Sequence, residues 1–264
     1  MIEEIWFEGL PTRVIGRKVL CFKKATSTND LAWLEISRGA AEGTVIFADE
    51  QLKGRGRFGR SWFAPRGGGL WFSIVLKPQI PPEHACLLMV IGAIAICELL
   101  RGKYQLPASI RWPNDVIVNG KKIAGIIVEA RYLANKPEAM VVGIGFNTNL
   151  KEADIPQDLT PFYLITSLSQ ECKRDIEEEP LAKDLLISLD NWYNKIRQKE
   201  YEVINRTWQE MSGVLNHVVI VKTADKEITG TVVSLDACTG ISIKTPAGQT
   251  LQFRGENVES LRLK

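Results

Sequence analysis

Apolar and polar positions alternate in two different ways along this chain. Up to about residue 212, apolar runs of helical length lie between shorter runs of strand length, which indicates helices packed on a mixed β-sheet. From about Val214 onward the apolar runs are short and separated by turn residues, a texture typical of a small antiparallel barrel. The pattern therefore predicts an α+β chain with one domain over residues 1–212 and a small β-barrel domain over 213–264.

Individual elements follow from the same pattern. Residues 26–30 (TSTND) can cap a helix that ends at Gly39. The longest apolar run, residues 85–97, has 13 residues and is followed by Glu98, so it is too short to cross a bilayer and predicts a buried helix over 83–101. The Asn119-Gly120 pair predicts a tight hairpin turn. The other expected elements are strands at 44–48, 70–76, 121–130 and 140–144 and helical residues at 180–209.

Composition and charge narrow the classes of protein. Of the 264 residues, 45% are hydrophobic and 24% charged, which excludes a disordered chain or a fibre. The 33 Lys and Arg against 31 Asp and Glu leave a net charge of +2, too little for a general field that attracts nucleic acid or anionic lipid. We therefore expect neither DNA nor a membrane as a partner.

Cysteines and histidines are few and dispersed. Five cysteines without a CxxC pair indicate neither a disulfide framework nor a zinc ribbon. Two distant histidines, His84 and His217, leave no HExxH motif, so no dedicated metal site is expected. The first ten residues are acidic and lack the apolar core of a signal peptide. The expected location is the cytoplasm.

The segment richest in candidate chemistry is residues 54–62 (GRGRFGRSW). Its three glycines let a ligand approach the backbone, and its three arginines supply donors for phosphate or carboxylate. The string half-matches the dinucleotide-binding and P-loop patterns, but both of those open a helix, and no helix is expected after this segment. It therefore predicts an anion-binding loop, with a solvated hairpin loop as the alternative.

Three further segments place polar side chains beside apolar strands. Residues 111–115 (RWPND) combine a cation, a ring, a stiff turn, an amide and a carboxylate, and an ordinary strand end with an Asx turn is the alternative. Lys122 stands in an otherwise apolar strand, where a lone lysine usually faces solvent. Residues 143–149 (GIGFNTN) end a strand in glycines and amides, which also fits a plain turn.

Taken together, five strings in this order resemble the biotin protein ligases, which attach biotin to a lysine of carboxylase carrier domains. The resemblance covers residues 20–150 by motif and implies the family's fold, a mixed sheet packed with helices as in class II synthetases, followed by a small SH3-like barrel. The strings are STN at 27–29, GRGRFGRSW at 54–62, RWPND at 111–115, KKIAGIIVE at 121–129 and GIGFNTN at 143–149.

The resemblance also implies which residues form the site. The expected catalytic residues are Arg55, Arg57, Asp115 and Lys122. The residues expected around biotin are Ser27, Thr28, Asn29, Gln51, Arg55, Gly56, Arg57 and Lys122. The residues expected around ATP are Arg57, Arg60, Arg111, Asn114, Lys122 and Asn147. Phe58 departs from the family pattern, because some relatives carry a further arginine at this position. The loop therefore has one positive charge fewer than in those relatives.

In the implied reaction, biotin's carboxylate attacks the α-phosphate of ATP and biotinyl-5′-AMP forms. Cations are needed because an anion attacks a polyanion; Arg55, Arg57 and Lys122 would supply them, with Mg²⁺ on the phosphates. A lysine of a biotin carboxyl carrier protein then attacks the mixed anhydride, and Asp115 is expected to orient that amine or take its proton.

Two other functions remain open at this point. A lipoate- or octanoate-transferring relative would share the general fold and a similar strand lysine. A single-stranded nucleic-acid-binding protein would use the arginine-glycine loop, against which the small net charge argues. Because the STN string begins at position 27, we expect the form of the family without an amino-terminal helix-turn-helix domain, and a homodimer is a further expectation. The role of the carboxyl-terminal barrel stays open.

Overall fold

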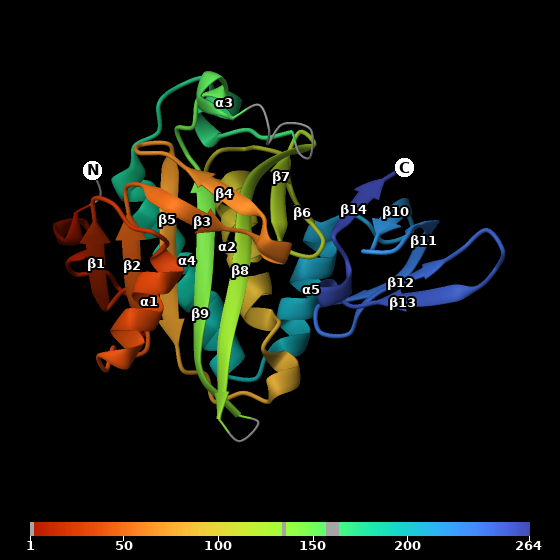
Figure 1. Ribbon diagram of the computed structural model, residues 1–264, viewed down its shortest axis with the longest axis horizontal. Helices are drawn as coiled ribbons and strands as arrows, with labels where there is room; N and C mark the ends of the chain where they lie inside the picture. The colour runs from red at the N-terminus through yellow and green to blue at the C-terminus, as the bar shows by residue number, and fades with distance from the viewer. Residues whose placement is uncertain (1–2, 134–135, 157–163) are drawn as a thin grey trace.

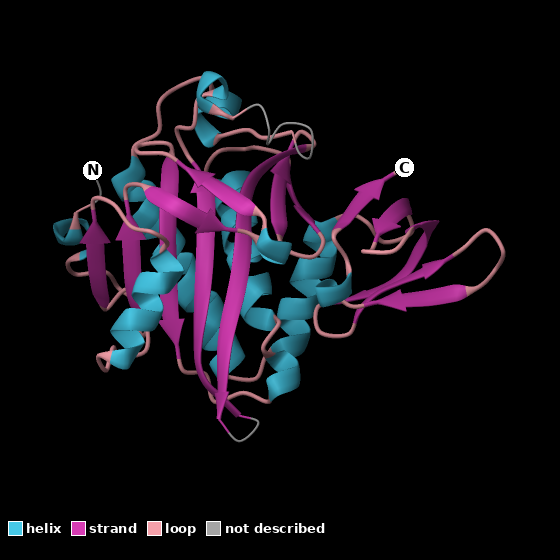
Figure 2. Ribbon diagram, in the orientation of Figure 1, coloured by secondary structure: helices cyan, strands magenta, loops and turns pink. Residues whose placement is uncertain are grey.

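The computed structural model describes residues 3–133, 136–156 and 164–264, and its centre is a seven-stranded mixed sheet (Figures 1 and 2). The strand order is β1-β2-β5-β9-β8-β7-β6, with β1 and β2 parallel and the other neighbours antiparallel. The strands are β1 (Lys18–Phe22), β2 (Thr44–Ala48), β5 (Gly69–Leu76), β6 (Ala108–Arg111), β7 (Asp115–Val118), β8 (Lys121–Leu133) and β9 (Lys136–Asn147). The predicted α+β class with a mixed sheet is confirmed.

Helices cover both faces of this sheet, which explains why its central strands are apolar at successive positions. Along β2, Val45 and Phe47 pack in the main core, whereas Ile46 packs on the opposite face with Ala32 of α1. The helix α1 (Thr28–Ser37) lies on that second face, and α2 (Leu87–Gly102), α4 (Glu178–Arg197) and α5 (Tyr201–Ser212) lie on the first (Figure 1).

The apolar helix predicted over 83–101 is α2, preceded by a 3₁₀ turn at Pro82–His84. By length and composition alone, the segment Pro82–Gly102 could cross a membrane. In the structure α2 contacts β6, β7, β8, α4 and α5, and most of its side chains are buried among them. Its apolar composition is therefore that of a core helix, as the sequence predicts.

The arginine-glycine segment forms a hairpin across the α1 side of the sheet (Figure 1). Strand β3 (Gln51–Arg55) pairs with β4 (Ser61–Ala64), and a 3₁₀ turn at Arg57–Gly59 lies between them. Phe58 in this turn has a φ of 56°, a left-handed conformation that reverses the chain. A strand follows the segment, so the rejection of the two nucleotide-loop patterns is confirmed.

The carboxyl-terminal residues form a second, five-stranded antiparallel sheet in the order β13-β12-β11-β10-β14. Its strands are β10 (Val218–Lys222), β11 (Glu227–Asp236), β12 (Gly240–Lys244), β13 (Thr250–Phe253) and β14 (Ser260–Leu263). This fits the SH3-like expectation, but residues 213–264 show no pairing between β13 and β14. Because a closed barrel needs its edge strands to pair, these residues form an SH3-like antiparallel sheet and not a closed barrel. The division at 212/213 stays a prediction.

Three other features differ from the sequence prediction or were not predicted. The helical residues 180–209 form two helices, α4 and α5, because the chain turns between them at Lys199, whose φ is 61°. Residues 110–118 contain the ends of two antiparallel strands, β6 and β7, joined through Trp112 and Pro113. The strand β1 and the short helix α3 (Leu168–Cys172) were not predicted.

Candidate active site

A cavity of about 470 Å³ lies between the α1 side of the main sheet, the β3–β4 hairpin and β14. Its walls come from stretches far apart in sequence: the start of α1, the hairpin, the β6–β7 turn, the start of β8, the end of β9 and β14. All the residues that the resemblance implies for the site line this cavity, namely Ser27, Thr28, Asn29, Gln51, Arg55, Gly56, Arg57, Arg60, Arg111, Asn114, Asp115, Lys122 and Asn147.

One end of the cavity is polar but uncharged. Ser27 is the N-cap of α1, and its hydroxyl accepts a hydrogen bond from the Asn29 backbone N–H at 3.3 Å. Gln51 Oε1 lies 2.8 Å from the Thr28 backbone nitrogen and 3.1 Å from Thr28 Oγ1. Asn29 lies directly on Gly143, where a Cβ would come within 2.4 Å of its Oδ1. This end is built to bind a neutral polar group.

A tryptophan from the hairpin lies flat against the sheet beside that end. The indole of Trp62 covers Gly145 of β9 and Gly125 of β8, where an added Cβ would meet the ring at 2.4 and 2.9 Å. The ring of Trp71 contacts it edge-on, with 6.3 Å between centroids. The two glycines therefore give the sheet a flat surface on which an aromatic wall of the cavity rests.

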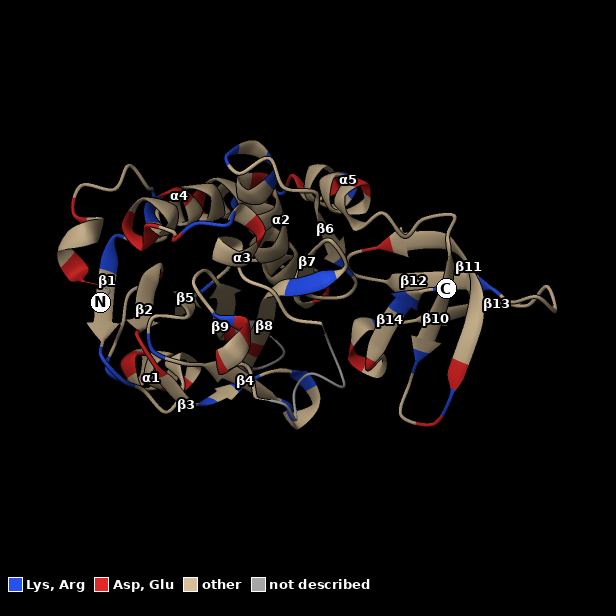
Figure 3. Ribbon diagram, turned by 90° about the horizontal axis from the view of Figure 1, so that it is seen from above, with Lys and Arg blue, Asp and Glu red and all other residues tan. Residues whose placement is uncertain are grey.

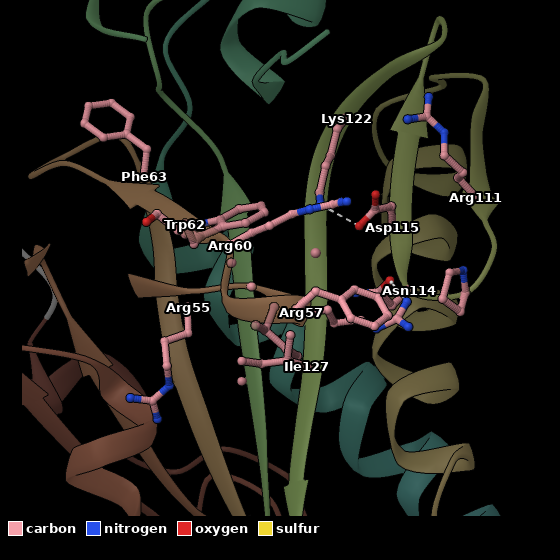
Figure 4. A pocket seen from close by; sticks show the side chains of 18 of the residues that line it. Arg55, Arg57, Arg60, Trp62, Phe63, Arg111, Asn114, Asp115, Lys122 and Ile127 are labelled. Carbon is pink, nitrogen blue, oxygen red and sulfur yellow. Dashed lines mark hydrogen bonds and ion pairs between the residues drawn. The ribbon is translucent and has the colours of Figure 1, made fainter. Parts of the chain in front are cut away.

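A lysine and an aspartate meet at the other end. Lys122 Nζ lies 2.6 Å from Asp115 Oδ1, and the two side chains are only 16% and 11% exposed (Figure 4). The Lys122 ammonium also lies 5.1 Å from the centre of the Trp62 ring, within cation–π range. Strands β7 and β8 bring the pair together because they are adjacent across the Asn119-Gly120 turn, whose hairpin the sequence predicts.

Two arginines of the hairpin reach the segment that joins β13 to β14 in the carboxyl-terminal sheet. Arg57 Nη2 donates to the backbone carbonyls of Gly255 and Val258. Arg60 Nη1 lies 3.4 Å from the Glu259 carbonyl, and its Nη2 lies 3.9 Å from the Glu259 carboxylate. The hairpin, the cavity and the second sheet are therefore one connected arrangement, a feature that the sequence left open.

Arg55 points away from Lys122 (Figure 4). Its guanidinium forms ion pairs with Asp30 of α1 at 2.5 Å and with Glu129 of β8 at 3.0 Å. Partial burial opposes its charge, but the hydrogen bonds to these carboxylates outweigh that effect and raise the pKa of Arg55. The arginine therefore ties the hairpin to α1 and the sheet.

The remaining predicted residues bind the backbone around the cavity. Asn114 Nδ2 donates to the carbonyl of Ile126 at 2.8 Å, and Asn147 Nδ2 donates to that of Thr166 at 2.9 Å. Arg111 Nη2 donates to the Gly120 carbonyl at 2.9 Å and lies apart from the other cations in Figure 4. These contacts hold the turns that shape the cavity.

Several site residues were not among those that the resemblance implies. Trp62 lies in a string that the sequence singled out, and Gly143 and Gly145 are two residues apart along β9, which could have indicated one exposed sheet face. Glu129 has no such signal, because its partners are remote in sequence. Its half-buried carboxylate is disfavoured by desolvation, but hydrogen bonds from Asn29, Trp33 and Arg55 prevail and lower its pKa.

Among the described residues, Lys and Arg positions do not form one basic stripe: they alternate with Asp and Glu positions over the helices and both sheets (Figure 3). The start of β8 is one visible basic segment. Among the described residues, no group of three or more His, Cys, Asp and Glu side chains could hold a metal ion.

Comparisons with known proteins agree with this arrangement. Residues 20–147 match the Biotin/lipoate A/B protein ligase family. The bifunctional ligase/repressor BirA of Bacillus subtilis is 31% identical over 201 residues, which cover 76% of this chain and 61% of that protein. The biotin–[acetyl-CoA-carboxylase] ligase of Paracoccus denitrificans is 29% identical over 86% of this chain and 94% of its own length.

A solved structure gives the same result for the fold. The biotin protein ligase of Aquifex aeolicus, in complex with biotin and ATP, superimposes with a TM-score of 0.78 at 28% identity, over 94% of this chain and 100% of that one. The chain spans about three fifths of the length of the first curated relatives, the Bacillus proteins. The domain at residues 20–147 belongs to the biotin/lipoate A/B protein ligase family.

Proposed function

We propose that this chain is an ATP-dependent biotin–protein ligase, which activates biotin to biotinyl-5′-AMP and transfers it to a lysine of a biotin carboxyl carrier protein. One observation carries the proposal: a single cavity has an uncharged hydrogen-bonding end and an end with Lys122, Arg57 and Arg60. Biotin has the same division, with a neutral ureido ring at one end and a carboxylate at the other. The Aquifex relative that binds biotin and ATP supports it.

In the first step a biotin carboxylate oxygen attacks the α-phosphorus of ATP, the bond to the bridging oxygen breaks, and pyrophosphate leaves. Lys122 would neutralise the charge that the carboxylate and the α-phosphate bring together. Arg57 and Arg60, at the rim beside the second sheet, would hold the phosphates. Mg²⁺ would arrive on those phosphates, because the described residues offer no cluster of metal-binding side chains.

In the second step the acceptor amine attacks the carbonyl carbon of the anhydride, an amide forms, and AMP leaves. A free lysine has a pKa of about 10.4 and is mostly protonated near neutrality, so it must lose a proton to react. The Asp115 carboxylate, 2.6 Å from Lys122 Nζ, would orient the incoming ammonium and accept that proton once the substrates have engaged Lys122.

The uncharged end favours biotin over lipoate or octanoate, because neither a dithiolane ring nor an alkyl chain can use the donors and acceptors of Thr28 and Gln51. The acceptor would be the carrier domain of a biotin-dependent carboxylase, as the name of the Paracoccus relative suggests. A cytoplasmic location and a homodimer belong to the same proposal; sedimentation of the purified chain tests the dimer.

Pyrophosphate exchange into ATP tests the function directly. Biotin should support exchange, whereas lipoate and octanoate at equal concentration should not. A biotin carboxyl carrier domain should then become reactive with streptavidin, and the same domain with its acceptor lysine replaced by arginine should not. Exchange that depends on lipoate or octanoate but not on biotin would refute the proposal, as would oligonucleotide binding without any exchange.

A further inference from the structure

A short segment, residues 164–166, holds the backbone of Lys122 at the edge of β8, and we call it the edge segment. The pairing of β8 with β9 begins only at Ala124, so beside Lys122 the edge segment lies next to β8 instead. The Lys122 N–H donates to the Leu164 carbonyl at 2.7 Å, and the Lys122 carbonyl accepts from the Thr166 N–H at 2.9 Å. Both backbone groups of the lysine are therefore fixed by this segment.

A carboxylate from α3 ties the edge segment to the turn that precedes β8. Glu171 Oε1 accepts from the Thr166 hydroxyl at 2.7 Å, and Glu171 Oε2 accepts from Asn119 Nδ2 at 2.7 Å. An ionised carboxylate only accepts, so it suits a position that faces two donors. Asn119 lies in the turn between β7 and β8. One side chain therefore reaches both the chain just before Lys122 and the segment beside it.

Thr166 is the residue through which the edge segment is held, and it is 0% exposed. Its N–H donates to Lys122, its carbonyl accepts from Asn147 Nδ2 at 2.9 Å, and its hydroxyl donates to Glu171. The first two bonds hold the segment on the main sheet, whereas the bond to Glu171 links it to the turn before β8. Loss of the carboxylate would therefore free the segment and the turn from each other, on both sides of the lysine.

We propose that Glu171 is a positioning residue for adenylate formation, which holds the Lys122 amine where the biotin carboxylate and the α-phosphate meet. The inference rests on the proposed function and deepens it. Glu171 is not among the described residues that line the cavity, so it acts through Lys122 and not on the substrates. The amine lies 2.6 Å from Asp115 (Figure 4). Placement of such a group matters, because a shift of about 1 Å at a reacting centre can slow a reaction about 10²-fold.

Two substitutions remove the connection to different extents. Glu171→Ala removes both hydrogen bonds of the carboxylate, and Thr166→Val removes one of them with little change in side-chain shape. Single-turnover formation of biotinyl-5′-AMP should slow about tenfold to a hundredfold in Glu171→Ala, and Thr166→Val should lie between this variant and the parent. In pyrophosphate exchange the loss should fall on kcat and leave the KM for biotin near the parent value, because α1 and the hairpin hold the uncharged end of the cavity.

Two comparisons separate positioning from a general loosening of α3. Gln170→Ala is the matched control, since it removes a hydrogen bond that the same helix makes to the Leu150 carbonyl at 2.8 Å. Its rate should stay near the parent value. In the Lys122→Ala background, Glu171→Ala should cause no further slowing, because a residue that acts through the lysine then has no amine to position. Thermal unfolding of each variant checks that the protein is folded.

The possible results separate the inference from the function. If the parent shows no biotin-dependent pyrophosphate exchange, the proposed function fails, and hydrogen–deuterium exchange of the Lys122 backbone amide tests the positioning by itself. That amide should exchange faster in Glu171→Ala than in Gln170→Ala, and equal rates would overturn the inference. With an active parent, the inference is overturned if Glu171→Ala forms the adenylate as fast as Gln170→Ala does. It is also overturned if Glu171→Ala raises the biotin KM at unchanged kcat, or slows the Lys122→Ala variant as much as it slows the parent.

Discussion

Gly145→Ala tests whether Trp62 rests on the sheet as the structure describes. The added Cβ would lie 2.4 Å from Trp62 Cε2 and 2.5 Å from Nε1. Carbon atoms are in favourable contact at about 3.5–4.0 Å, so the ring must move by about 1 Å or more. Overpacking of this kind costs about 1–3 kcal/mol of folding free energy.

A graded series makes the test quantitative. At Gly125 the nearest ring atom would be 2.9 Å from the added Cβ, so Gly125→Ala needs about half that movement and should cost less. Gly102, at the end of α2, has nothing within 4 Å, so Gly102→Ala should be neutral or slightly stabilising.

Urea unfolding measures the free energy of each variant, and calorimetry measures its affinity for biotin. The expected order of destabilisation is Gly145→Ala, then Gly125→Ala, then Gly102→Ala. The first should also bind biotin at least tenfold more weakly, because Trp62 lines the cavity. If Gly145→Ala matches Gly102→Ala in stability and keeps the parent affinity, Trp62 does not lie on this face.

Three other predictions concern carboxylates. Asp190, 2% exposed, accepts hydrogen bonds from three consecutive backbone N–H groups at residues 13–15. Asp190→Ala should lower the free energy of unfolding in urea by about 3 kcal/mol. A loss under about 1 kcal/mol would contradict its anchoring role. Burial, only partly opposed by the Thr148 hydroxyl, raises the pKa of Glu178, so the stability that Glu178 contributes is complete below its pKa in the unfolded chain and is lost as pH rises through its pKa in the folded protein. The free energy of unfolding of the parent should therefore fall relative to that of Glu178→Gln from pH 4 to 7. A difference that does not change with pH would refute this. Asp115→Asn should slow single-turnover transfer from purified biotinyl-AMP at least as much as it slows adenylation; unchanged transfer would remove Asp115 from that step.

Local signals in the sequence predicted much of the fold. The side chain of Ser27 caps α1, which ends at Ser37 before the predicted stop at Gly39. Residues 44–48 form β2 with the predicted bounds, because a short apolar run between turn residues has few other stable conformations. The Asn119-Gly120 turn carries its conformational preference in two adjacent residues, both of which have positive φ.

The composition of the cavity was also predictable, although the orientation of its cations was not. Arg55 and Arg57 are separated by one glycine, yet one pairs with Asp30 and the other donates to the carbonyl of Gly255. That divergence depends on the 3₁₀ turn after Gly56 and on partners that the chain brings from remote segments. Glu129 is likewise 100 residues from Asn29, and no short-range pattern predicts such a contact.

Closure of the second sheet also depends on long-range geometry. The sequence predicts short antiparallel strands there, and five are present. The edge strands β13 and β14 can pair only if the sheet has enough twist and shear. Twist and shear accumulate over the whole sheet, and the spacing of strands in the sequence does not reveal them.

On the proposed function, Lys122, brought by β8 to the cationic end of the cavity, would neutralise the charge that develops as biotin and ATP join. The most direct measurement is the single-turnover rate of biotinyl-5′-AMP formation in Lys122→Ala, compared with Lys121→Ala at the exposed neighbouring position. Lys122→Ala should be slower by about 10²–10³-fold, while Lys121→Ala should keep the parent rate. Equal rates in the parent and both variants would contradict it.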